Sequence, residues 1–257
     1  MTLPEYSHPP VVEVVCGAQF EPVPLLAAYL GRLLDRLPEG FRPTRELASL
    51  MPIVEHLGEQ PHSMILEGSL SPRVWFESAG GEQLVQIQSD RLLFNWRKQT
   101  PTHDYPRYPA VWDAFKRHLG TFEAFVEQEV GSHVSHRQFE LTYVNHIEVD
   151  GIPLERLAQI LPDFSWRTSQ RFLPTVERMD SRLSFLLPNR RGRLHVRAQN
   201  GLRNVDQKPV LILELTARGF AESREDWFAL AHEWIVRGFA DLTGEDLQRV
   251  TWERREA

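Results

Sequence analysis

The sequence predicts an α+β protein with an antiparallel sheet built from two related β-α-β-β-β-α halves, whose long helices pack on one face. Three observations predict this class: short apolar segments typical of strands recur, two long segments carry apolar residues at helical spacing, and a strand, a proline corner and a helix follow one another twice. The halves cover roughly 10–130 and 137–245. The chain then divides into 1–136 and 137–257, as two lobes of one continuous domain.

The first half opens with a valine-rich strand over Pro10–Phe20, which two prolines separate from a short amphipathic helix. The stretch from Pro38 to Pro72 shows little periodicity, so we expect a long irregular connection with a short strand at Ser63–Leu66. Turn residues then separate three strands of a predicted antiparallel meander, at Arg73–Ser78, Gln83–Gln88 and Arg91–Lys98. An apolar stripe from Val111 to Val126 predicts a long helix that covers the meander.

The second half repeats this order. Phe139–Val149 reads as a strand, and its corner Asp150–Leu154 matches Glu21–Leu25 in the first half without a gap. A short helix is expected from Leu154 to Leu161. The remaining elements are strands at Ser181–Leu187, Arg193–Gln199 and Val210–Arg218, and a helix whose apolar side runs from Trp227 to Leu242.

Composition excludes several classes of protein. A formal net charge of -6 argues against a chain whose main task is to neutralise nucleic-acid phosphates. The single cysteine, Cys16, excludes an internal disulfide framework and a thiolate zinc site, and no signal or membrane segment is evident, so we expect a cytoplasmic protein. Phosphate-loop, dinucleotide and nucleophile-elbow motifs are absent, and the histidines lack metal-ligand spacing, so no cofactor or metal is expected.

Three glutamates on predicted strands are candidates for chemistry: Glu140, Glu148 and Glu214. Glu214 lies between leucines, and a buried glutamate needs a partner, for which we expect Arg197 or Arg218. A structural ion pair is the favoured interpretation, and acid-base catalysis is the alternative.

Two surfaces are candidates for binding. The first combines Asn95, Trp96 and Arg97 with Tyr105 and Tyr108, because such side chains dominate binding hot spots, although these aromatics could instead cap the core. Asn145 and His146 on the next strand extend it. The second is a basic hairpin at 188–208, whose exposed face could meet phosphate, an acidic partner or solvent. Its candidate arginines are Arg190, Arg191, Arg193, Arg197 and Arg203, against one acid of the same segment, Asp206.

Several segments together resemble a sporadically distributed family of uncharacterised bacterial and archaeal proteins. They are Pro9–Gly17, Phe94–Lys98, Tyr105–Pro109, Thr142–Ile147, Glu214–Gly219 and His232–Phe239, followed by Thr243 and Trp252. The resemblance spans nearly the whole chain and implies a shared fold in a bacterial setting, without an activity, a cofactor or a catalytic residue.

The leading hypothesis for function is a non-enzymatic binding protein that recognises a protein partner or a small ligand through the sheet or a helix-sheet cleft. One alternative is a nucleic-acid-associated or defence-related module that uses the basic hairpin, which the sporadic distribution implied by the resemblance also allows. The other is an enzyme of unfamiliar type, with polar residues around Asn95, His146 and Glu214. The oligomeric state is left open.

Overall fold

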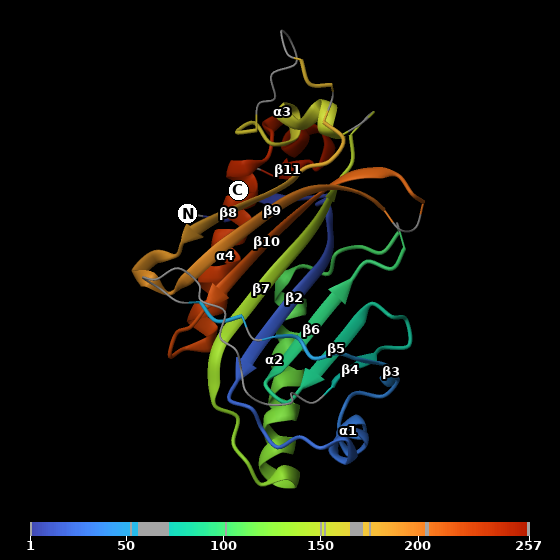
Figure 1. The fold of residues 1–257 in the computed structure, drawn as a ribbon, viewed down its shortest axis with the longest axis vertical. Coiled ribbons are helices and arrows are strands. Elements are labelled where there is room, and N and C mark those ends of the chain that lie inside the picture. Colours follow the sequence, from blue (N-terminus) through green and yellow to red (C-terminus); the bar gives the residue numbers. More distant parts are fainter. Residues whose placement is uncertain are drawn as a thin grey trace.

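A single twisted sheet of nine strands forms the body of the protein, with two long helices on one of its faces (Figure 1). The computed structural model describes residues 2–51, 53–55, 72–100, 102–149, 151, 153–164, 172–174, 176–203 and 206–255. All neighbouring strands of the sheet run antiparallel. The predicted α+β class, with an antiparallel sheet covered by helices on one face, is confirmed.

The strand order is β3-β4-β5-β6-β2-β7-β10-β9-β8, with β2 and β7 paired at the centre. The strands are β2 (Val11–Phe20), β3 (Arg42–Leu47), β4 (Arg73–Glu77), β5 (Gln83–Gln88), β6 (Arg91–Arg97), β7 (His136–Ile147), β8 (Asp180–Leu186), β9 (Gly192–Leu202) and β10 (Pro209–Gly219). Outward from the centre, β6, β5 and β4 follow β2 in the same sequence in which β10, β9 and β8 follow β7.

This symmetry agrees with two halves of like topology, but it does not establish their common origin. The duplication and the boundary between residues 136 and 137 stay predictions. Asp150 and Ile152 of the second predicted corner lie outside the described residues. One continuous hydrophobic core contains residues from both halves.

Two long helices, α2 (Tyr108–Phe125) and α4 (Arg224–Leu242), lie behind the sheet in Figure 1. The Ser223 side chain accepts a hydrogen bond from the backbone N–H of Asp226 at 3.1 Å and thereby caps the start of α4. The shorter helical elements are α1 (Ala27–Leu34), α3 (Leu157–Ile160), the 3-10 turns Pro153–Arg156 and Pro188–Arg190, and the π turns Val126–Val130 and Leu247–Thr251.

Apolar side chains fill the interface between the helices and the sheet. Side chains alternate along a strand, so every second residue of each central strand faces the helices. Fully buried examples are Cys16 of β2, Phe94 of β6, Leu141 of β7 and Leu213 of β10, against Phe115 of α2 and Phe228 of α4. Among the described residues, no helix has the length and apolar character needed to cross a membrane.

The prediction of a long irregular connection from 38 to 72 is corrected, because residues Arg42–Leu47 of this stretch form strand β3. Its residues are mostly exposed because β3 lies at one end of the strand order, so the segment lacks the apolar alternation that identifies a strand. The predicted strand at Ser63–Leu66 lies outside the described residues. A two-stranded pairing of β1 (Glu5–Tyr6) with β11 (Arg254–Arg255), which was not predicted, brings the chain ends together.

Candidate functional site

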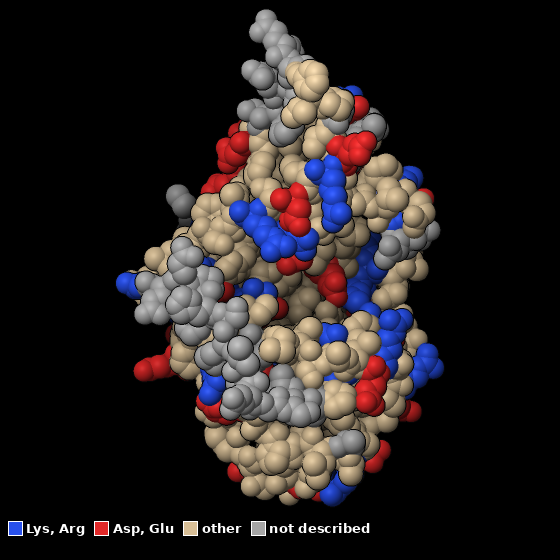
Figure 2. Space-filling view, viewed as in Figure 1, with Lys and Arg blue, Asp and Glu red and all other residues tan. Residues whose placement is uncertain are grey.

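The opposite face of the sheet carries no helix in the described part of the chain, and it is polar. In Figure 2, which shows this face, acidic and basic side chains gather around a hollow near its middle. The polar character follows from strand alternation: Glu13, Asn95 and Glu214 occupy the positions between residues that face the core. Paired residues of antiparallel strands point to the same face, so the register brings these side chains into neighbouring rows.

Two short chains of hydrogen-bonded side chains, here named together the central polar cluster, occupy the middle of this face. Its members are Glu13, Gln86, Asn95, Thr142, Glu214 and Thr216. Gln86 donates through Nε2 to Asn95 Oδ1 at 2.8 Å, and Asn95 donates through Nδ2 to Glu13 Oε1 at 2.7 Å. The hydroxyls of Thr142 and Thr216 are 2.9 Å apart, and Thr216 Oγ1 donates to Glu214 Oε1 at 3.3 Å.

The two carboxylates of the cluster differ from the other carboxylates on this face. Ion pairs join Glu77 to Arg97, Glu140 to Arg218 and Asp180 to Arg197. Within the described residues, neither Glu13 nor Glu214 takes part in an ion pair.

The sequence-based expectation that Arg197 or Arg218 would pair with Glu214 is therefore wrong. Arg197 does lie opposite Glu214 in the register, but its guanidinium reaches outward to Asp180 of β8 with two hydrogen bonds, of 3.0 and 2.7 Å. A two-point contact with a carboxylate fits the planar guanidinium better than a single contact does.

Burial raises the pKa of the Glu13 carboxyl. The hydrogen bond from Asn95 and the charge of Arg97 act in the opposite direction, while the negative charge of Glu214 raises the pKa further. A carboxyl whose charge is disfavoured in this way gains from any cation placed beside it.

A segment formed by residues 49–51 and 53–55, here named the strap, crosses the polar face in front of the strands (Figure 1). Gln88 and Leu50 exchange hydrogen bonds of 2.9 and 3.0 Å, and Gln138 both accepts from the Glu55 N–H at 2.9 Å and donates to the Ile53 carbonyl at 2.6 Å. The buried glutamines thus hold the strap through its backbone.

The strap ends at Glu55, whose carboxylate accepts hydrogen bonds from Arg193, at 2.8 Å, and from His195. Burial raises the pKa of Glu55, but these two hydrogen bonds outweigh it, so that the pKa lies below its ordinary value. Glu55 thereby neutralises part of the basic hairpin from a distant position in the sequence. No motif near Glu55 predicts this contact.

The residues of the first predicted surface are divided between the two faces of the sheet. Asn95 and Arg97 lie on the polar face, and Arg97 donates to the Glu77 carboxylate at 3.1 Å. Trp96 points to the helix side, only 6% exposed, and its ring centroid lies 5.3 Å from that of Tyr105. The Tyr108 ring stacks on the His232 imidazole of α4, with 3.8 Å between the ring centroids. A ligand contact for these five residues of the first predicted surface stays a prediction.

Asn145 and His146 are likewise separated, because they are consecutive on β7. Asn145 is buried and donates to the Leu213 carbonyl at 3.0 Å, which is a structural role within the sheet. His146 lies on the polar face, where burial lowers its pKa and the nearby charge of Arg203 lowers it further. His146 Nδ1 has no hydrogen-bond partner among the described residues.

Distant acids neutralise much of the basic hairpin. Arg193 pairs with Glu55 and Arg197 with Asp180, while Arg203 contacts both Glu148 and Asp206. At the turn between β8 and β9, Arg190 is exposed and Arg191 is partly exposed. The nucleic-acid hypothesis therefore depends chiefly on the two arginines of this turn.

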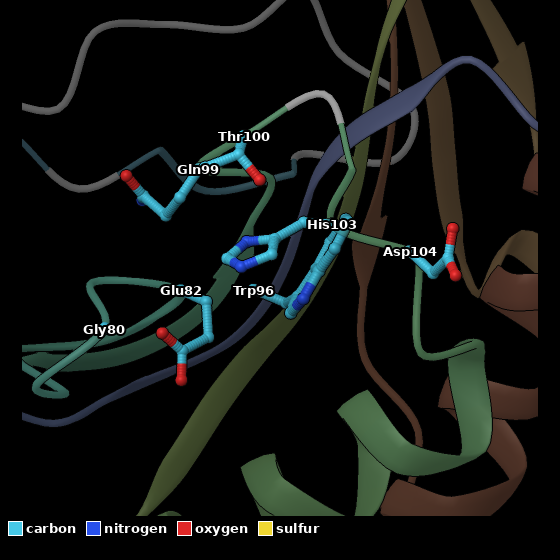
Figure 3. Close-up of a pocket in the computed structure, with 7 residues that line it drawn as sticks. All are labelled: Gly80, Glu82, Trp96, Gln99, Thr100, His103 and Asp104. Atoms are coloured by element: carbon cyan, nitrogen blue, oxygen red, sulfur yellow. The ribbon is translucent and has the colours of Figure 1, made fainter.

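A separate cavity of about 490 Å³ lies where the turn between β4 and β5 meets the loop after β6 (Figure 3). Its lining consists of Gly80, Glu82, Trp96, Gln99, Thr100, His103 and Asp104. In Figure 3 the His103 ring lies beside Trp96, while the Asp104 carboxylate points away from it. The volume suits a small ligand. However, the carboxylates of Glu82 and Asp104 point in different directions, whereas the polar groups of a specific binding site converge on the ligand.

Three of the decisive side chains were missed at the level of sequence: Glu13, Gln86 and Glu55. Polar residues at alternate positions of Gln83–Gln88 could have indicated a polar sheet face. Among the described residues, no three histidine, cysteine or acidic side chains are grouped so that they could hold a metal ion.

In comparisons with protein-family models and with curated proteins, nothing matches this chain. The family resemblance stays a prediction, and the candidate site stands on its geometry.

Proposed function

We propose that this protein is a non-enzymatic binding protein whose ligand, a small molecule or a side chain of a protein partner, lies on the polar face of the sheet over the central polar cluster. One observation carries the proposal: Glu13 and Glu214 have no ion-pair partner among the described residues, on a face where neighbouring carboxylates are paired. A charge left unpaired at a partly buried position costs stability and is commonly retained for function.

The helix side of the sheet gives less support for a ligand. The rings and aliphatic side chains between the helices and the sheet form one packed core, so a helix-sheet cleft has no support there. Polar groups converge instead on the opposite face, where Glu13 and Glu214 are partly exposed to solvent.

An enzyme of unfamiliar type is the second candidate, favoured by the raised pKa of Glu13 beside another carboxylate. Among the described side chains of the cluster, the hydroxyl that donates to a carboxylate is that of Thr216, and its 3.3 Å distance to Glu214 Oε1 is long for a nucleophile and its base. Incubation of the protein with each ligand found separates the candidates, because an enzyme converts its ligand and a binding protein returns it unchanged.

A cytoplasmic location forms part of the proposal. Its support is the single cysteine, together with the burial of Cys16, which raises the pKa of the thiol well above its ordinary value and keeps it unreactive.

The proposal is tested with a library of small polar metabolites and amide chemical-shift mapping. We expect hits to shift the amides of Glu13, Thr142 and Glu214. Hits that shift only the amides of Gln99 and His103 would place the ligand in the cavity of Figure 3 and contradict the proposal.

A further inference from the structure

The middle of the polar face carries two carboxylates that make no ion pair within the described part of the chain. Glu13 of β2 and Glu214 of β10 both pair in register with Val144 of β7, so the three residues form one row across the sheet. The cations nearest in this row, Arg97 and Arg197, are bound to carboxylates further out. Two negative charges therefore flank one apolar side chain.

The hydrogen bonds of the cluster also leave one buried acceptor, on Gln86, without a donor. Gln86 and Asn95 each donate one amide N–H within the chain that leads to Glu13. Gln86 is only 6% exposed, and its Oε1 has no donor among the described residues. A buried acceptor without a donor destabilises the protein, so a hydrogen-bond donor beside it would be stabilising. This acceptor lies on β5, at the far end of the chain of hydrogen bonds that leads to Glu13, and it adds to the excess of acceptors on the polar face.

The spacing suits a group that lies between the carboxylates. Strands β2 and β10 are each one strand spacing from β7, which places the Cα atoms of Glu13 and Glu214 ~10 Å apart. Each carboxylate uses its Oε1 within the cluster, Glu13 toward Asn95 and Glu214 toward Thr216, and its Oε2 is left for a group that lies over Val144. The partly exposed Val144 offers an apolar contact for a methylene chain.

We infer that this site binds an organic cation, a primary amine or a guanidinium, whose charged group lies between Glu13 and Glu214 with its alkyl stem over Val144. The inference rests on the proposed function and names its ligand class. A divalent metal fits less well, because calcium and magnesium require six or more oxygen ligands in a compact shell. Two carboxylates on strands that are not neighbours do not supply such a shell.

Isothermal titration and amide chemical-shift mapping test this inference with four probes: agmatine, putrescine, neutral 1,4-butanediol and anionic succinate. We expect agmatine and putrescine to shift the amides of Glu13, Val144 and Glu214, and the other two probes to have no effect. Glu13→Gln and Glu214→Gln should each weaken agmatine binding about tenfold, the effect expected when one charge-assisted contact is lost.

Two further variants serve as controls. Glu140→Gln changes a carboxylate of the same face that is already paired with Arg218, so agmatine affinity should change less than about twofold. Val144→Lys supplies an ammonium within the chain, between the two carboxylates, and should abolish agmatine binding while the protein stays folded.

The outcomes distinguish failure of the organic-cation site from failure of ligand binding on the polar face. Equal agmatine affinity in the wild type and in the Glu13→Gln and Glu214→Gln variants overturns the cation site. If succinate or butanediol shifts the same amides instead, the ligand class is wrong, although a ligand still lies on this face. If agmatine, putrescine and the metabolite library all leave these amides unshifted, the proposed function itself fails.

Discussion

Replacing Glu13 by glutamine removes one of the two neighbouring negative charges on the polar face and keeps the Oε1 acceptor that Asn95 uses. The register places Glu13 and Glu214 two strand spacings apart, ~10 Å between Cα atoms. At an effective dielectric constant of ~20, two unit charges at this distance repel by ~1.7 kcal/mol. Screening at physiological salt, with a Debye length of ~8 Å, reduces this repulsion to ~0.5 kcal/mol.

Burial of the Glu13 charge adds to the repulsion, because it is the largest cause of the raised pKa. We therefore expect Glu13→Gln to increase the free energy of unfolding by about 0.5–1.5 kcal/mol at pH 7, measured by urea denaturation. Because the pKa is higher in the folded state, the native carboxyl holds its proton more tightly, and stability is lost as the pH rises through the raised pKa. Below the ordinary glutamate pKa both states are protonated, so the gain should vanish near pH ~3.5.

Three comparisons check this explanation. Glu140→Gln breaks a partly exposed ion pair and should lower stability by about 0–1 kcal/mol at pH 7. The double variant Glu13→Gln with Glu214→Gln should gain about 0.5 kcal/mol less than the sum of the single variants, since the repulsion is removed only once. A Glu13→Gln protein that is less stable than the wild type at pH 7, or a gain that persists at low pH, would refute the reasoning.

Three other predictions concern the rest of the fold. Gly192→Ala should lower the free energy of unfolding by about 3 kcal/mol or more in denaturant unfolding, because Gly192 has a backbone φ of +139° and a Cβ there would lie 2.0 Å from the Arg218 carbonyl oxygen. Gly120→Ala, at an exposed position of α2, is the control and should raise it by about 0.5–1 kcal/mol. Cys16 should react with a thiol reagent only in denaturant, because it is fully buried; rapid reaction of the folded protein would contradict this. Burial lowers the pKa of His232 to about 4, so the imidazole should titrate near that value by NMR, and its contribution to stability should fall as the pH drops from about 6.5 to about 4.

The fold class could be predicted from local patterns, because burial imposes a period on the sequence that can be recognised without tertiary contacts. The strands at Gln83–Gln88 and Val11–Phe20 alternate or run apolar, and the stripe from Val111 to Val126 has helical spacing. The edge strand at Arg42–Leu47 escaped this reasoning because its residues are mostly exposed and carry no such period.

The candidate site could not be predicted in this way, because its contacts join residues that are far apart in the sequence. Alternation places Asn95 and Trp96 on opposite faces of a strand, but only the strand register brings Asn95 within hydrogen-bond distance of Glu13. The basic hairpin looked unneutralised because its acids, Glu55 and Glu148, come from distant parts of the chain.

Hydrophobic periodicity thus determined an α+β chain with an antiparallel sheet and helices on one face. Only the tertiary structure decided that Glu13, Val144 and Glu214 form one row, since strand order and register bring together residues about two hundred positions apart. The same register left Arg97 and Arg197 with outer carboxylates. Ion pairing depends on distances of a few ångströms between side chains, which no pattern along a single chain records.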